Sequence, residues 1–316
     1  MHTAKIPLLY LGGGEPLLFK EIIELIQYAH TYGIKCKLFT NGTLLDRLSQ
    51  NQLDTLRKCA TSVSVSIDSF SNEKEDFIKG LSGVLTQQIK GIEKILDNNI
   101  TMNICTVISS YNYDGLFDLV KNIDKLGIHQ IKFQPVIFIS NFPESDTISN
   151  KKNLNINLDH IPKIKNQFEL ILKYEKKSKI RTNIPLLRRW LFDYIDSIYS
   201  NEPEYSTDKE LFFKKVLHKF YCATIYSDIA INYYGQIMPC NMLGPRESIK
   251  DNKEESLLDL WNKSSDSLRK GIKNDFFPEE CRSCVNACDG NLIYSTLKYP
   301  ISNYHIIPYV LRAIIK

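Results

Sequence analysis

Five of the eight cysteines crowd into the last third of the sequence, at spacings that suit a bound metal. They are Cys222, Cys240, Cys281, Cys284 and Cys288. Because the chain begins without a recognisable export signal, the C-x2-C pair among them favours a metal or iron–sulfur site over a disulfide framework. On spacing alone, structural zinc is the favoured interpretation. The other three, Cys36, Cys59 and Cys105, each stand in an apolar segment and are expected to be small core residues.

Glycine and polar residues that could hold a ligand follow several apolar runs in the first half of the chain. Gly12-Gly13-Gly14-Glu15 would let the backbone approach a ligand closely, because glycine has no Cβ. It is neither a P-loop nor a G-x-G-x-x-G fingerprint. Taken alone, Thr40-Asn41-Gly42 is typical of a turn, and Asp68 is typical of a helix cap.

These segments belong to a strand–helix alternation that fills the first 140 residues. The predicted strands are 6–11, 36–40, 62–67, 101–108 and 130–134. The predicted helices carry apolar residues at helical spacing and start near Leu18, Leu45, Val84 and Leu116. Such an alternation predicts a parallel sheet with right-handed crossovers, whose strand carboxyl ends form one ligand-binding edge.

As an ordered set, the motifs resemble the radical S-adenosylmethionine (SAM) superfamily over roughly residues 6–138. One strand ends in Gly-Gly-Glu-Pro, the next in Thr-Asn-Gly, and the third contains Ser66-Ile67-Asp68. The following stretch, from Lys79-Gly80 to the strand ending at Val107, is similar too. The resemblance implies a partial (β/α)6 TIM-like barrel that binds SAM across its strand carboxyl ends, here missing its first β/α unit.

The same resemblance implies roles for individual residues. Gly12, Gly13 and Glu15 would hold the methionine amino group of SAM. Ser66 and Asp68 would lie near its ribose and carboxylate. The full set of expected SAM-binding positions is Gly12, Gly13, Gly14, Glu15, Asn41, Ser66, Asp68, Thr106 and Gln134.

The late cysteines resemble a different module, the SPASM/twitch auxiliary-cluster domain. The resemblance rests on the pattern C-x12-G-x4-C, which runs from Cys222 through Gly235 to Cys240 and is followed by a helical segment and the C-x2-C pair. It implies one auxiliary [4Fe–4S] cluster bound by Cys222, Cys240, Cys281 and Cys284, with Cys288 as a spare or alternative ligand. Structural zinc stays the other interpretation.

The superfamily's C-x3-C-x2-C loop, which binds the catalytic [4Fe–4S] cluster, occurs nowhere in the 316 residues. In the family this loop precedes the glycine-rich strand. We therefore expect an N-terminal truncation, a catalytic cluster only in the complete protein, and no SAM cleavage by the chain as given.

The resemblance implies a radical SAM oxidoreductase or maturase that generates a 5′-deoxyadenosyl radical for hydrogen abstraction. A peptide or protein substrate is expected, with flavodoxin or ferredoxin as electron donor. The alternative is a non-catalytic iron–sulfur or zinc-binding remnant or scaffold. The DNA upstream of the Met1 codon separates them, because an in-frame cysteine triad supports the enzyme and a stop codon supports the remnant.

Composition adds few constraints. A net charge of +4 supports no nucleic-acid partner, and no apolar run approaches the roughly 20 residues that span a bilayer, so a cytoplasmic protein is expected. Four regions are expected: a truncated radical SAM barrel (1–140), a linker and helical segment (141–220), a SPASM/twitch domain (221–296) and a C-terminal tail (297–316).

Overall fold

The computed structural model describes residues 6–136, 154, 156–188, 191–192, 222–240 and 243–273, with the single residues 297, 301 and 307. The chain divides into two compact units, and each is described by itself. The first comprises Met1–Val136 and Glu144–Ile184, and the second comprises Ile137–Pro143 and Pro185–Lys316. The predicted C-x2-C-x3-C segment, nearly all of the tail and much of the predicted linker and helical segment lie outside the described residues.

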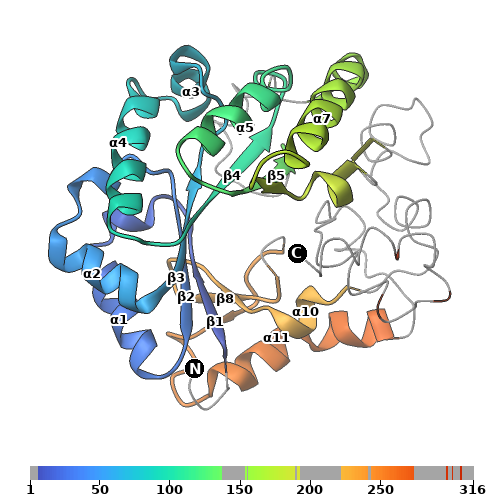
Figure 1. The fold of residues 1–316 in the computed structure, drawn as a ribbon. Coiled ribbons are helices and arrows are strands. Elements are labelled where there is room, and N and C mark those ends of the chain that lie inside the picture. The colour runs from blue at the N-terminus through green and yellow to red at the C-terminus, as the bar shows by residue number, and fades with distance from the viewer. Residues whose placement is uncertain are drawn as a thin grey trace. The chain divides into compact units, whose positions relative to one another are not determined.

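A six-stranded parallel sheet forms the centre of the first unit (Figure 1). The strands, in both chain order and sheet order, are β1 (Leu8–Leu11), β2 (Lys35–Thr40), β3 (Ala60–Ser66), β4 (Met102–Ile108), β5 (Gln130–Pro135) and β6 (Arg181–Thr182). Each strand pairs in parallel with the next. The five predicted strands are thus confirmed in place, direction and order. Strand β6 was not predicted, because two residues cannot show an alternating pattern.

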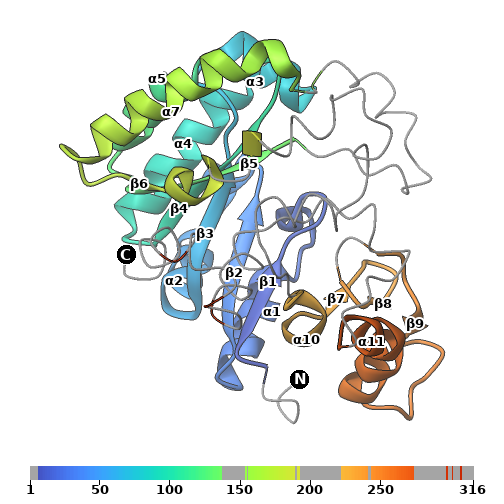
Figure 2. The same ribbon diagram turned by 90° about the vertical axis from the view of Figure 1, so that its right-hand side faces the viewer.

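Helices follow the strands and lie along one face of this sheet (Figures 1 and 2). They are α1 (Ile22–Thr31), α2 (Gln50–Cys59), α3 (Asn72–Lys79), α4 (Val84–Asp97), α5 (Leu116–Lys125) and α7 (Ile161–Glu175). The first helix begins later than predicted, because Leu18 belongs to a preceding 3-10 turn and is exposed. Helix α3 was not predicted, since its eight residues include only Phe77 and Ile78 as apolar side chains.

The two faces of the sheet differ in composition. Residues alternate between buried and less buried along β4 and β5, and the buried set, such as Ile104 and Phe133, is apolar apart from Thr106 and packs beneath the helices. The opposite set, which we call the inward face, is mainly polar, although Tyr10, Phe39 and Val107 also belong to it. It includes Lys37, Ser62, Ser64, Ser66, Asn103, Cys105, Lys132 and Gln134. Ser62 and Ser64 on this face are buried whereas Lys132 and Gln134 are exposed, so the inward face is covered at β3 and accessible at β5.

Two glycines allow a close approach between the turn after β2 and helix α4. A Cβ on Gly42 would lie 2.7 Å from Val65 Cγ1, and the φ of Gly42 is +83°. A Cβ on Gly91 would lie 2.6 Å from Leu45 Cβ. Larger residues at either position would force the helix away from the carboxyl end of β2.

The described part of the second unit includes a small antiparallel sheet and the helices α10 and α11. Its elements are α10 (Thr224–Ser227), β7 (Ala230–Ile231), β8 (Gln236–Met238), β9 (Glu247–Ser248) and α11 (Leu257–Lys273). The predicted hairpin is confirmed by the pairing of β7 with β8, and Gly235 in its turn has a φ of +80°. None of the helices within the described ranges is long and apolar enough to cross a membrane.

Candidate functional site

The glycine-rich loop after β1 is fastened to β2 by Glu15. One carboxylate oxygen, Oε1, accepts hydrogen bonds from the Thr40 hydroxyl at 2.7 Å and from the Leu17 backbone N–H at 3.1 Å. The other, Oε2, accepts from the Asn41 backbone N–H at 2.7 Å. With three donors inside the protein, this carboxylate fixes the position of the loop.

The glycines of that loop leave space beside it. A Cβ built on Gly13 or Gly14 meets no atom within 4 Å, and Gly13 has a φ of +122°. A Cβ on Gly12 meets Phe39 Cβ at 3.7 Å, an ordinary contact. The backbone of Gly13 and Gly14 is therefore open to approach by a ligand.

Asn41 shapes the turn at the end of β2. Its side-chain Oδ1 accepts hydrogen bonds from the backbone N–H of Thr43 at 2.9 Å and from the Thr43 hydroxyl at 2.7 Å. Its backbone carbonyl accepts from Gln88 Nε2 at 2.8 Å. Asn41 is thus oriented from both sides, and it stands next to the Glu15 anchor.

At the end of β3, Lys79 joins two of the predicted site residues. Its Nζ donates to the Ser66 hydroxyl at 2.8 Å and lies 2.7 Å from Asp68 Oδ2, in an ion pair. The other oxygen of Asp68 accepts from the Val107 backbone N–H at 2.6 Å. Asp68 is 4% exposed and Lys79 15% exposed, so the ammonium group is the more accessible partner.

The buried carboxylate of Glu75 holds the backbone that follows β3. Glu75 has no exposed surface, and its Oε2 accepts from the backbone N–H groups of Asp68 at 3.0 Å and Ser69 at 2.8 Å. Burial raises the pKa of the Glu75 carboxyl, while the Lys79 ammonium at 3.8 Å acts to lower it. Gln88 Nε2 bridges Glu75 Oε1 at 3.2 Å and the carbonyl of Ser66 at 3.0 Å.

Asn112 and Thr106 tie the ends of β3 and β4 together. Asn112 Nδ2 donates to the carbonyls of Asp68 at 2.7 Å and Val107 at 2.8 Å. The Thr106 hydroxyl is buried and donates to the Ile67 carbonyl at 2.7 Å. Thr106 therefore links two strands, whereas the resemblance had placed it in the ligand pocket.

Gln134 stands at the end of β5, in register with Val107, and is exposed.

Four of the predicted residues form two linked pairs along one edge of the sheet. Glu15 binds Asn41 directly, and Ser66 and Asp68 are joined by Lys79. Sequence analysis did not single out Lys79, Glu75, Gln88 or Asn112 as site residues. The i, i+4 spacing of Glu75 and Lys79 was a usable signal for one of these contacts.

The described part of the second unit contains two of the predicted cluster ligands, Cys222 and Cys240. Cys222 precedes α10 and packs beside the buried pair Ile225 and Leu268, and Cys240 follows β8 and is 7% exposed. Neither forms a disulfide. Soft thiolates fit the donor set of an iron–sulfur cluster and also that of structural zinc. No group of three potential metal ligands occurs in the described part of the chain, and Cys281, Cys284 and Cys288 lie outside it.

Cys105 differs from the other two isolated cysteines. Cys36 and Cys59 are buried, as expected of core residues. Cys105 is half-buried on the inward face, between Ser66 and Lys132 in the strand register. The expectation that Cys105 is a core residue was therefore wrong, because its parity along β4 places it opposite the helices.

Comparison with known proteins identifies both modules. Residues 2–123 match the model of the radical SAM superfamily, and residues 222–285 match the SPASM iron–sulfur cluster-binding domain. The chain is 31% identical to an AdoMet-dependent heme synthase of Oleidesulfovibrio alaskensis over 121 residues. The matched segment covers 38% of this chain and 31% of that protein. The chain thus spans about a third of the length of that curated relative.

Longer but more distant matches also occur. The chain is 21% identical over 278 residues to a PqqA peptide cyclase of Granulibacter bethesdensis, covering 87% of this chain and 66% of that protein. Its fold is similar to that of Streptococcus suis SuiB bound to the precursor peptide SuiA, with a TM-score of 0.57 and 17% identity. That similarity covers 91% of this chain and 62% of SuiB.

Proposed function

Because the chain belongs to the radical SAM superfamily and carries an iron–sulfur SPASM domain, we propose that it is the SAM-binding and auxiliary-cluster portion of an enzyme that modifies a peptide or protein. SAM and a reduced [4Fe–4S] cluster, when bound, would supply a 5′-deoxyadenosyl radical for hydrogen abstraction. A flavodoxin or ferredoxin would be the electron donor. The domain boundaries proposed are 1–140, 141–220, 221–296 and 297–316.

The observation that carries the proposal is the Lys79–Ser66–Asp68 group at the end of β3, which lies on the same edge of the sheet as the open glycine loop after β1. SAM carries both an amino and a carboxylate group on its methionine part. The Lys79 ammonium donates to Ser66 and pairs with Asp68, which leaves the third of its N–H groups to bind a carboxylate. The open backbone at Gly13 and Gly14 offers carbonyl acceptors for an ammonium group. The residues present therefore fit SAM.

The role of Glu15 is revised by its contacts. Its two oxygens already accept three hydrogen bonds, so we propose that it orients the loop and leaves the methionine amino group to backbone acceptors. Asn41 and Gln134 would line the same site, and Thr106 would position β4.

In the second unit, Cys222 and Cys240 would hold an auxiliary [4Fe–4S] cluster together with Cys281 and Cys284. Cys288 would be an alternative ligand. The peptide substrate is supported by the match to a peptide cyclase along 87% of this chain and by the fold shared with a protein bound to its precursor peptide.

SAM binding tests the proposal most directly. Equilibrium dialysis with radiolabelled SAM should give weaker binding for Ser66→Ala and for Lys79→Met than for the native chain, by about fivefold to tenfold for a lost charge-assisted contact. Lys79→Arg, which keeps the charge, should bind better than Lys79→Met. Equal affinity in all four proteins would remove the proposed SAM carboxylate site.

Cleavage is a separate test. The 316 residues contain no C-x3-C-x2-C, so nothing within them supplies the three thiolates of the catalytic cluster. We propose that these residues alone, reconstituted with iron and sulfide and reduced with dithionite, make no 5′-deoxyadenosine. A fusion that supplies the triad ahead of β1 should make it slowly. Cleavage by the 316 residues alone would show that another ligand set holds a catalytic cluster.

A further inference from the structure

A guanidinium group in the second unit has only neutral partners among the described residues. Arg269 lies near the end of α11 and is half-buried. Its Nε donates to the Ile225 carbonyl at 2.9 Å, and its Nη1 donates to Asn262 Oδ1 at 2.6 Å. No carboxylate lies within ion-pair distance of Arg269 in the part of the chain that the structure describes. Half-buried cations are normally balanced by a negative charge, so Arg269 indicates an anionic partner of another kind.

Two aromatic rings hold this guanidinium in place. The Cζ of Arg269 lies 4.4 Å from the centroid of the Trp261 ring and 5.6 Å from that of the Tyr226 ring. The Tyr226 hydroxyl also donates to the Arg269 carbonyl at 3.2 Å. The nearest carboxylate along the helix, Asp266, pairs instead with Lys270 at 2.6 Å. Because aromatic rings and neutral acceptors fix its position, the charge of Arg269 stays available to a ligand.

The contacts of Arg269 lead directly to Cys222. This cysteine lies two residues before α10, and it packs against the buried pair Ile225 and Leu268. Arg269 binds the carbonyl of Ile225 and follows Leu268 in the sequence of α11. Both residues that pack against Cys222 are therefore attached to Arg269, one by a hydrogen bond and the other by a peptide bond.

Cys240 is connected to the same pair of residues. Leu243 also packs against Ile225 and Leu268, and its backbone N–H donates to the Cys240 carbonyl at 3.2 Å. Helix α11 contacts both α10 and β8, the elements next to the two cysteines (Figure 2). The two described ligands of the predicted cluster thus share one apolar support, and Arg269 adjoins it.

The side of α11 that ends at Arg269 offers two further hydrogen-bond donors. Trp261, Ser265 and Arg269 are spaced four residues apart, so they form one row along the helix. Trp261 Nε1 and Ser265 Oγ are buried and have no hydrogen-bond partner among the described residues. The indole N–H can only donate, and the hydroxyl can donate as well. A cation and two such donors in one row suit an anionic ligand that accepts hydrogen bonds.

An iron–sulfur cluster bound by thiolates is a ligand of this kind. Its net charge is negative, and its reduction potential depends on nearby charges and on hydrogen bonds to its sulfur atoms. We propose that Arg269 is the counter-charge of the auxiliary cluster at Cys222 and raises its reduction potential. The physical reason is that reduction adds an electron to a group that lies near a cation. The inference rests on the proposed function for the identity of the cluster.

A redox titration followed by electron paramagnetic resonance tests the inference on the anaerobically reconstituted chain. The 316 residues contain no C-x3-C-x2-C, so the proposed function assigns them the auxiliary cluster alone. Arg269→Met removes the charge and keeps an aliphatic stem. It should make reduction about tenfold less favourable, which lowers the potential of a one-electron couple by about 59 mV. Arg269→Lys, which keeps the charge, should restore most of that difference.

A second variant neutralises the cation without removing it. Asn262→Asp places a carboxylate where Arg269 now meets an amide oxygen. The new ion pair should keep Arg269 attached and should still make reduction about threefold to tenfold less favourable. Lys270→Met is the matched control, because it changes the net charge equally at an exposed side chain that is paired with Asp266. Its potential should equal that of the native chain.

A purely structural role for Arg269 predicts a different pattern. If the guanidinium only fastens α10 to α11, Asn262→Asp keeps its iron at an unchanged potential, and that result would overturn the inference. Loss of iron from Arg269→Met does not prevent this test, since Asn262→Asp retains the guanidinium. An equal fall in Lys270→Met would contradict the inference too, because net charge alone would then explain it. Zinc and no iron in every protein would remove the iron–sulfur assignment as well, whereas an unchanged potential with iron retained leaves that assignment in place.

Discussion

The sheet edge of the first unit and the cysteine region of the second are organised in opposite ways. At the sheet edge, Glu15, Asp68, Glu75 and Asn112 are each held by two or more hydrogen bonds or ion pairs from the protein itself. In the second unit, Cys222 and Cys240 lie next to elements of only four and three residues, α10 and β8. Buried polar atoms without a hydrogen-bond partner occur in both units, Asp46 Oδ1 and Gln88 Oε1 in the first and Trp261 Nε1 and Ser265 Oγ in the second.

This difference indicates which of the two sites has its final geometry before its ligand binds. A network of buried polar groups that bind one another across several elements holds its own geometry, and it pre-orients whatever binds there. A site built from thiolates on short elements becomes ordered when the metal binds, because the free energy of metal binding then contributes directly to the stability of the fold. The sheet edge should therefore tolerate loss of its cofactor, and the cysteine region should not.

The largest effect is expected from removing a cluster ligand. Cys222→Ala or Cys240→Ala should abolish the brown colour and reduce the iron content from about four per chain to below one. Hydrogen exchange in 222–273 should rise in both variants, while exchange in β1 to β5 stays unchanged.

The control for this prediction is Cys36→Ala, which removes a thiol from the first unit and should keep the iron. Recovery of one zinc ion and no iron from anaerobic preparations would contradict the iron–sulfur assignment. Unchanged exchange in 222–273 after metal loss would contradict the comparison itself.

A smaller but still large effect is expected at Gly91 on α4. Alanine in a helix interior is normally favoured over glycine by about 1 kcal/mol. Here its Cβ would lie 2.6 Å from Leu45 Cβ and 3.1 Å from the Gly42 carbonyl, so the steric term should dominate. We expect Gly91→Ala to lower the free energy of unfolding by about 3 kcal/mol, as measured by urea denaturation.

Gly14→Ala is the matched control, since its Cβ meets nothing within 4 Å, and its stability should be unchanged. A stabilised Gly91→Ala would mean that α4 can move away from the turn after β2. The sheet edge would then be less rigid than its contacts indicate.

The contacts at the sheet edge also show which features could be predicted from the sequence and which could not. The strand order and the shared edge followed from the alternation of apolar runs and helical repeats, because parallel strands must place their carboxyl ends together. The partners of each side chain did not follow. Lys79 and Asn112 come from segments 11 and 44 residues after Asp68, and only the packing of α3 and of the turn after β4 brings them to it. Cys105 was misassigned because an apolar neighbourhood in sequence does not tell which face of a strand is covered.

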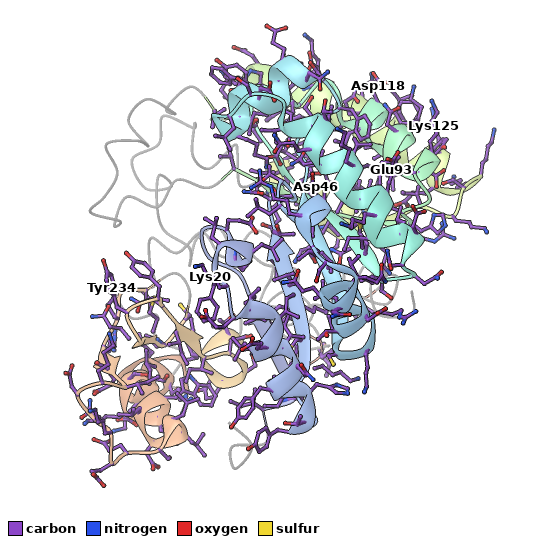
Figure 3. All side chains as sticks on the ribbon, turned by 90° about the vertical axis from the view of Figure 1, so that its left-hand side faces the viewer. Lys20, Asp46, Glu93, Asp118, Lys125 and Tyr234 are labelled. Carbon is purple, nitrogen blue, oxygen red and sulfur yellow. The ribbon has the colours of Figure 1, made fainter. Side chains whose placement is uncertain are left out.

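An intermediate effect is expected from Glu15. Glu15→Ala leaves the Asn41 N–H and the Thr40 hydroxyl without their acceptor, which should cost about 2 kcal/mol of stability. Glu15→Gln should cost less, because one amide oxygen can still accept. The exposed Glu93 on α4 provides the control, and Glu93→Gln should leave the urea midpoint unchanged (Figure 3). Equal stability of Glu15→Ala and the native chain would refute the anchoring role.

The smallest effect, and the one that tests the electrostatics of the sheet edge, is a pH dependence due to Glu75. Burial raises the pKa of its carboxyl, and the nearby Lys79 ammonium lowers it by less, so the folded state binds the proton more tightly than the unfolded chain does. Its contribution to stability is then fully present below the ordinary pKa of a glutamate and is lost as the pH rises through the raised pKa. Glu75→Gln has no proton to lose. The difference in unfolding free energy between the native chain and this variant, followed by urea denaturation from pH 4 to pH 8, should therefore shift in favour of the variant as pH rises. Other carboxyl groups cancel in that difference, and Glu93→Gln should show none of it. A shift in favour of the native chain would mean that Lys79 outweighs burial, and that the sheet edge is held by the Asp68–Lys79–Glu75 charges rather than by the hydrogen bonds that Glu75 accepts.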